Sequence, residues 1–105
     1  MAYETEKQAY DQQGFVIVRQ LLNPDDFAEL QENLARYVRE VVPNLPDADA
    51  FYHDRSRPDT LKQLQRMGGD PYFGQYIQNS KWTALAQALV GEPVSADQPE
   101  WFNKP

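Results

Sequence analysis

The sequence predicts an α+β fold made mainly of helices. Several segments begin with a helix-capping residue and continue with apolar residues three and four positions apart, as amphipathic helices do. Residues 15–18 and 101–102 are expected to form strands, because both runs are rich in β-branched or aromatic residues. Two strands make a marginal sheet. We therefore interpret residues 1–105 as a single incomplete domain whose remaining strands lie elsewhere.

The first predicted helix covers residues 4–13 and ends at Gly14, since glycine adopts the left-handed conformation after a helix at little cost. The uninterrupted apolar run at residues 15–18 then predicts a strand that is buried on both faces. A lone strand leaves its backbone N–H and C=O groups without partners. This segment is thus expected to require neighbouring strands.

The second helix is expected to begin at Asn23, which can cap it, with Pro24 in its first turn. One apolar stripe follows the helix to about Val42, and Pro43 is expected to end it. The stripe consists of Phe27, Leu30, Leu34, Val38 and Val41.

The middle of the chain, residues 43–58, is rich in proline and aspartate and is interpreted as a loop. Phe51 and Tyr52 either anchor this loop or form a short strand within it. Residues 60–67 have helical composition, and the two glycines that follow are expected to end that helix.

Two further helices are predicted in the second half, with Asp70 and Ser80 as their capping residues. Gly91 is expected to end the last of them. From Val94 onward the chain is predicted to be extended, with β propensity at residues 101–102.

Composition restricts the class of partner. The net charge is −6, which argues against nucleic acid because phosphate repels such a surface. No apolar run approaches the roughly 18 residues that span a bilayer, so no membrane partner is expected. The chain has no cysteine, which rules out disulfides and thiolate chemistry within it and fits a reducing compartment. We expect a cytoplasmic protein.

Few residues indicate chemistry. His53 is the only histidine, and a metal site there would require converging ligands such as the neighbouring aspartates; a surface histidine is the favoured interpretation. The aromatic residues of the second half have two interpretations. Core packing at helical spacing is favoured over the lining of an apolar substrate pocket. These residues are Phe51, Tyr52, Tyr72, Phe73, Tyr76, Trp82, Trp101 and Phe102.

Three stretches in order resemble the phytanoyl-CoA dioxygenase-like family. The stretch YDQQGFVIVRQLLNPDDFAELQENL resembles the family's opening helix, DGFVVV-like strand and capped helix. The stretch LKQLQRMGGDPYFGQYIQNSKWTALAQALVGEPV resembles the segment that follows it, and WFNKP resembles a strand that ends in Lys-Pro. The resemblance covers residues 10–105.

The resemblance implies part of a non-haem Fe(II), 2-oxoglutarate-dependent oxygenase. Its fold would be a double-stranded β-helix, of the jelly-roll or cupin-like type, of which this chain holds the N-terminal helices and two strands. The family binds iron through an H-x-D … H triad that would follow the Lys-Pro strand. Here His53 is followed by Asp54 and Arg55, which is not H-x-D, and there is no second histidine.

The chain alone is therefore expected to bind neither iron nor 2-oxoglutarate and to be inactive. The resemblance implies that Gln98, Phe102 and Lys104 form part of the cosubstrate or substrate pocket, because strand alternation would place them on one face. An alternative is equally favoured, in which Phe102 belongs to the core and Lys104 is a solvated strand end. The implied partners are the remainder of the oxygenase domain and a small organic or acyl substrate.

A second interpretation needs no enzyme. The chain would then be a non-catalytic helical interaction module whose exposed strand is completed by a partner or a second copy, because unpaired strand edges invite such pairing.

Overall fold

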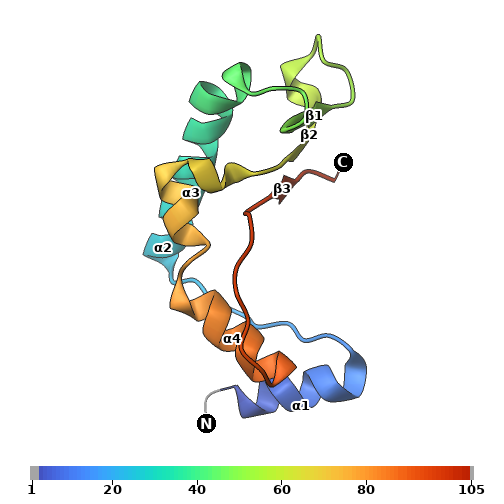
Figure 1. The fold of residues 1–105 in the computed structure, drawn as a ribbon, viewed down its shortest axis with the longest axis vertical. Coiled ribbons are helices and arrows are strands. Elements are labelled where there is room, and N and C mark those ends of the chain that lie inside the picture. Colours follow the sequence, from blue (N-terminus) through green and yellow to red (C-terminus); the bar gives the residue numbers. More distant parts are fainter. Residues whose placement is uncertain (1–2, 105) are drawn as a thin grey trace.

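The computed structural model describes residues 3–104, which form an α+β fold with four α-helices and one small open sheet (Figure 1). The molecule is elongated, measuring 49 × 26 × 25 Å. At one end, α1 (Glu4–Gln13) packs beside α4 (Ser80–Val90); we call these two helices the helical pair. At the other end lie the sheet, α2 (Pro24–Arg36) and α3 (Pro71–Tyr76), which we call the sheet end.

The predicted end of α1 and the predicted start of α2 are confirmed. Gly14 follows α1 with φ 83°, and its N–H donates to the Tyr10 carbonyl oxygen at 2.8 Å. Asn23 caps α2 by accepting from the Asp26 backbone N–H at 2.8 Å. Both contacts join residues three or four positions apart. A short stretch of sequence therefore contains all that is needed to place these ends.

The helical path of α2 continues past Arg36 as a π-helical turn, Tyr37–Val41, and a 3₁₀ turn, Val42–Asn44. The predicted length is thus close to the observed one, although Pro43 lies within the last turn. The predicted apolar stripe is only partly covered, because Phe27 is 50% exposed and Val38 is 37% exposed.

The sheet consists of three antiparallel strands in the order β1–β2–β3. These are β1 (Ala50–Tyr52), β2 (Leu61–Leu64) and β3 (Trp101–Phe102). The short strand at Phe51–Tyr52 and the terminal strand are confirmed. The helix predicted over residues 60–67 is wrong, because the central strand β2 occupies its middle.

Tertiary pairing explains this error. Ala50 pairs with Leu64 on one side of β2, and Trp101 pairs with Leu64 on the other. The side chain of Leu64 is fully buried. Burial and two rows of backbone hydrogen bonds outweigh the helical preference of the leucines and glutamines.

The hydrophobic core lies entirely in the sheet end. Its buried residues are Tyr37, Val42, Ala50, Leu61, Leu64, Met67 and Phe73. Neither α1 nor α4 contains a buried residue. The helical pair is instead held by half-buried contacts, including a hydrogen bond from the Lys7 Nζ to the Leu89 carbonyl oxygen at 3.4 Å.

The segment at residues 15–18 differs from its prediction. It is extended but belongs to no strand, and within the described residues its backbone forms no hydrogen bond. Phe15 is 59% exposed and Ile17 is 67% exposed, while Val16 and Val18 are half-buried. The prediction of burial on both faces is therefore wrong, because the three strands that could have flanked this segment lie at the other end of the molecule (Figure 1).

Candidate functional site

The three predicted pocket residues have different surroundings. The Gln98 side chain forms a hydrogen bond to its own chain: its Oε1 accepts from the Gly68 backbone N–H at 2.9 Å. A Cβ atom at Gly68 would lie 2.5 Å from that oxygen, so the contact requires glycine. Phe102 is 60% exposed in β3, and Lys104 is exposed just beyond it. None of the three predicted residues lines either cavity described below.

The loop that carries His53 shows local interactions. The His53 backbone N–H donates to the Thr60 carbonyl oxygen at 3.0 Å, and the imidazole lies on the exposed surface. The Asp54 carboxylate accepts from the Ser56 backbone N–H and hydroxyl, not from His53. Across residues 3–104, no three histidine, cysteine, aspartate or glutamate side chains are grouped to hold a metal ion. These residues do not fit the Fe(II) site of the resembled family.

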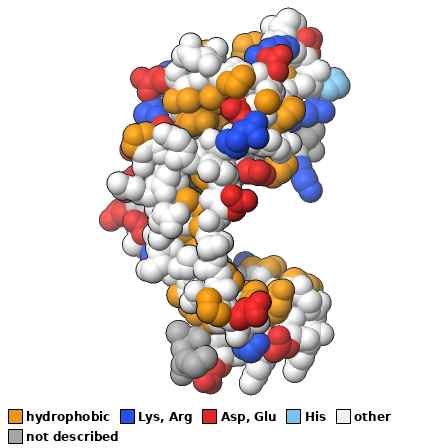
Figure 2. All heavy atoms as spheres, viewed as in Figure 1, with side chains coloured by type: hydrophobic (Ala, Val, Ile, Leu, Met, Phe, Trp, Pro, Cys, Tyr) orange, Lys and Arg blue, Asp and Glu red, His pale blue; other side chains and the backbone are white. Residues whose placement is uncertain are grey.

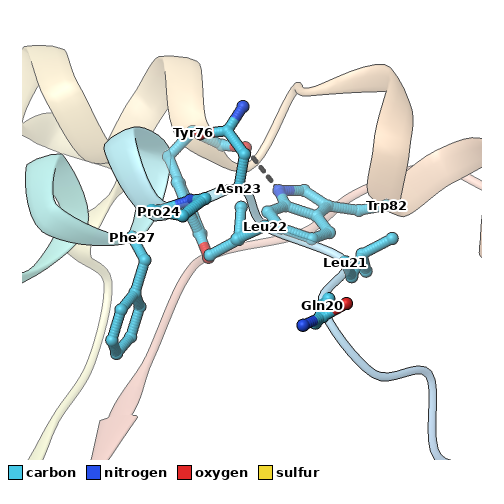
Figure 3. Close-up of a pocket in the computed structure, with 8 residues that line it drawn as sticks. All are labelled: Gln20, Leu21, Leu22, Asn23, Pro24, Phe27, Tyr76 and Trp82. Carbon is cyan, nitrogen blue, oxygen red and sulfur yellow. Dashed lines mark hydrogen bonds between the residues drawn. The ribbon is translucent and has the colours of Figure 1, made fainter.

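A mainly apolar cavity lies where the helical pair joins the sheet end (Figure 3). We call it the waist pocket; Figure 2 shows the narrowing of the molecule at this level. Its volume is about 830 Å³, within the usual range for small-molecule sites. Its lining comes from the loop before α2, the start of α2, the end of α3 and the start of α4. The lining residues are Gln20, Leu21, Leu22, Asn23, Pro24, Phe27, Tyr76 and Trp82.

Three interactions orient the elements that form the waist pocket. The Trp82 indole Nε1–H donates to the Tyr76 carbonyl oxygen at 2.7 Å, which ties the start of α4 to the end of α3 (Figure 3). The two aromatic rings are tilted by 50° with centroids 5.1 Å apart. Lys81 and Asp26 form an ion pair at 3.3 Å that links α4 to α2. The aromatic wall therefore has a defined orientation.

A smaller cavity of about 200 Å³ adjoins the waist pocket and shares Leu22 and Tyr76 with it. We call it the acidic pocket, because Asp26 and Glu29 both line it. Its other lining residues are Tyr72, Gln75 and Asn79. The rings of Tyr72 and Tyr76 stack with centroids 5.9 Å apart and an interplanar angle of 30°.

The pKa values of the tyrosines reflect these surroundings. Burial raises the pKa of Tyr76. Burial also raises the pKa of Tyr72, and the negative charges of Glu29 and Asp26 raise it further. Both phenols are therefore neutral at neutral pH.

One ion pair fixes the helix that carries both tyrosines. Arg36 donates to the two Asp70 oxygens at 3.0 and 2.8 Å, so the pair is bidentate. Asp70 Oδ2 also accepts from the backbone N–H groups of Tyr72 and Phe73, which caps α3 as predicted. Only 6% of the Asp70 side chain is exposed. The end of α2 thus sets the start of α3.

Sequence reasoning only partly anticipated this site. Tyr76 and Trp82 were among the aromatic residues for which pocket lining was the less favoured interpretation, and Phe27 was expected in a packed stripe. Leu21, Leu22 and Glu29 were not among the residues predicted to line a pocket. Leu21 and Leu22 stand together between two predicted elements, and such an apolar pair in a loop is the feature that could have indicated a pocket.

The linings of the two cavities are suited to binding a ligand. Among their described residues, no nucleophile is hydrogen-bonded to an acid–base side chain that would activate it for catalysis. Within the described part of the chain, no helix is long and apolar enough to cross a membrane. No family model matches the chain, and no curated protein or solved structure shows significant similarity to it.

Proposed function

We propose that this chain is the N-terminal part of a non-haem Fe(II), 2-oxoglutarate-dependent dioxygenase or hydroxylase that acts on a small organic or acyl substrate. The sequence resemblance to the phytanoyl-CoA dioxygenase-like family supports the proposal. The observed order of α1, an extended apolar segment, the capped helix α2 and a terminal strand β3 is compatible with it. In this proposal, β3 and a neighbouring strand belong to a double-stranded β-helix that further chain completes.

The segment at residues 15–18 carries the proposal. Its backbone N–H and C=O groups have no protein partner among the described residues, and Phe15 and Ile17 expose most of their side chains. An apolar extended segment gains backbone hydrogen bonds and buries these side chains when strands are added beside it. A sheet in the remainder of an oxygenase domain would supply such strands.

The role of this chain in the enzyme would be structural. Its residues do not fit the iron, so no chemical step is assigned to them. The chain would supply outer helices, strands and part of the pocket wall. Gln98, Phe102 and Lys104 remain the proposed contacts to cosubstrate or substrate, although the contact of Gln98 with Gly68 favours a positioning role for that side chain.

The reading frame beyond Pro105, a residue outside the described part, tests the proposal. We expect an H-x-D sequence shortly downstream and a histidine further on. The protein extended through these residues should convert 2-oxoglutarate and O₂ to succinate and CO₂, with the second oxygen atom going to the substrate, when Fe(II) and substrate are supplied. A native stop codon directly after Pro105, with no such sequence nearby, would contradict the proposal.

The same segment favours one alternative, a non-catalytic interaction module. Sedimentation then should show association at micromolar concentration, and Phe15→Ser with Ile17→Ser should abolish it. Val90→Ser is a matched control because Val90 is an exposed apolar residue (52%) at the far end of α4. A monomer at all concentrations would exclude self-association.

A further inference from the structure

The waist pocket and the acidic pocket form one two-part cavity with opposite chemistry in its two parts. No charged side chain lines the waist pocket, whose walls are mainly leucine and aromatic side chains. Two carboxylates line the acidic pocket. Because Leu22 and Tyr76 belong to both linings, a single ligand could contact both parts.

The acidic pocket holds an uncompensated negative charge. Asp26 is paired with Lys81, but within residues 3–104 no cationic side chain pairs with the Glu29 carboxylate. Both carboxylates are close enough to Tyr72 to raise its pKa. The net charge of −6 adds a general attraction for cations.

Aromatic faces add a second source of cation affinity. Tyr72 and Tyr76 line the acidic pocket as a stacked pair, and tyrosine rings attract ammonium and guanidinium groups through their electron-rich faces. The amide side chains of Gln75 and Asn79 lie in the same lining, although the Asn79 oxygen already accepts from the Lys81 backbone N–H. Among the described residues, no three metal-ligating side chains are grouped here, and the two tyrosine rings suit an organic cation.

We propose that the two pockets bind an amphipathic organic cation. Its ammonium or guanidinium group would lie between Glu29 and the rings of Tyr72 and Tyr76. Its apolar body would occupy the waist pocket against Leu22, Phe27 and Trp82. This proposal does not depend on the oxygenase function, because it uses none of the residues assigned to that site.

Three probes of similar shape and different charge test the proposal. These are 4-phenylbutylamine, which is cationic at neutral pH, neutral 4-phenylbutanol and anionic 4-phenylbutyrate. The chain has two tryptophans, so its two indole N–H signals in a ¹⁵N NMR spectrum report on two places. Trp82 lines the waist pocket, whereas Trp101 packs against the core and serves as an internal control; Trp101→Phe assigns the signals.

We expect the amine to shift the Trp82 signal saturably at millimolar concentration, the alcohol to bind more weakly and the acid to bind most weakly. Glu29→Gln should weaken amine binding about two- to fivefold, the range of an exposed charge or cation–π contact, and should leave alcohol binding unchanged. Glu32→Gln is the matched control, since Glu32 is an exposed glutamate of the same helix that lines neither pocket.

Three outcomes would overturn the proposal. Equal affinity for the three probes would show that the cavity binds apolar groups and does not select for positive charge. Equal effects of Glu29→Gln and Glu32→Gln would place the electrostatic attraction outside the acidic pocket. If the indole N–H signal of Trp82 showed no saturable shift, or if only that of Trp101 shifted, the probes would not bind in this cavity. Circular dichroism of the two variants checks that they remain folded.

Discussion

At the scale of single residues, Asp70 makes the densest set of polar contacts in the sheet end. Its carboxylate accepts two hydrogen bonds from Arg36 and two from the backbone of α3. Such charge-assisted bonds are stronger than neutral ones, and only 6% of the Asp70 side chain is exposed. The side chain therefore joins α2 to α3 and orients the tyrosines of the acidic pocket.

Replacement of Asp70 by alanine should lower the free energy of unfolding by about 2–4 kcal/mol, because it removes a helix cap and leaves Arg36 without its partner. Urea unfolding measures this change. Asp59→Ala is the control, since the Asp59–Arg57 pair is exposed and should contribute less than about 1 kcal/mol. Equal losses in the two variants would contradict the assigned role of Asp70.

The same residue predicts a pH dependence. Burial favours a higher pKa for Asp70, but the hydrogen bonds from Arg36 and from the Phe73 backbone outweigh it and hold the pKa below the ordinary value of 3.8. A lowered folded-state pKa stabilises the protein above the unfolded-state value, and this contribution is lost as pH falls through the folded-state pKa.

The stability advantage of the unmodified chain over Asp70→Asn should thus be full at about pH 5 and should shrink as the pH falls below about 4. Urea unfolding at a series of pH values measures it. A difference that stays constant across this range would show that the charge of Asp70 is not the stabilising feature.

At the scale of elements, the start of α4 shows how closely capping residues can be confused. Ser80 was predicted to cap this helix, but the structure assigns the cap to Asn79, whose side chain accepts from the Lys81 backbone N–H at 2.9 Å. Both residue types cap helices well. Only the backbone conformation distinguishes them, because Asn79 is extended and Ser80 is the first helical residue.

Asn79→Ala should therefore destabilise the protein by about 0.5–2 kcal/mol, the usual cost of a lost cap. Ser80→Ala should change the stability by less than about 0.5 kcal/mol, as an exposed substitution does. Thermal unfolding followed by circular dichroism compares the two. A larger loss of stability in Ser80→Ala than in Asn79→Ala would show that Ser80 caps the helix.

At the scale of the whole molecule, the uneven distribution of buried residues predicts uneven stability. The buried hydrophobic cluster lies between Tyr37 and Phe73, Pro99 is buried just before β3, and the helical pair contains no buried residue. Local opening is easiest where few apolar contacts are buried. Backbone amides of α1 and α4 should thus exchange with deuterium faster than those of β2.

Hydrogen exchange measured by mass spectrometry on the full chain tests this expectation. Equal protection of the helical pair and the sheet end would mean that the molecule opens as one unit. Added strands beside residues 15–18 should slow exchange in that segment, so the same measurement on a longer form of the protein also reports on the proposed oxygenase domain.

Local sequence was enough to predict the C-terminal end of α1 and the starts of α2 and α3, because glycine at a helix end and an asparagine or aspartate cap act through hydrogen bonds to residues at most four positions away. It also predicted the edge strand β3, and it offered a strand as one of two interpretations of residues 51–52. Packing between distant segments, in contrast, makes residues 61–64 the central strand, leaves Phe15 and Ile17 exposed, and brings Leu22, Tyr76 and Trp82 together at one pocket. Each of these outcomes depends on segments distant in sequence, whose approach no local pattern specifies.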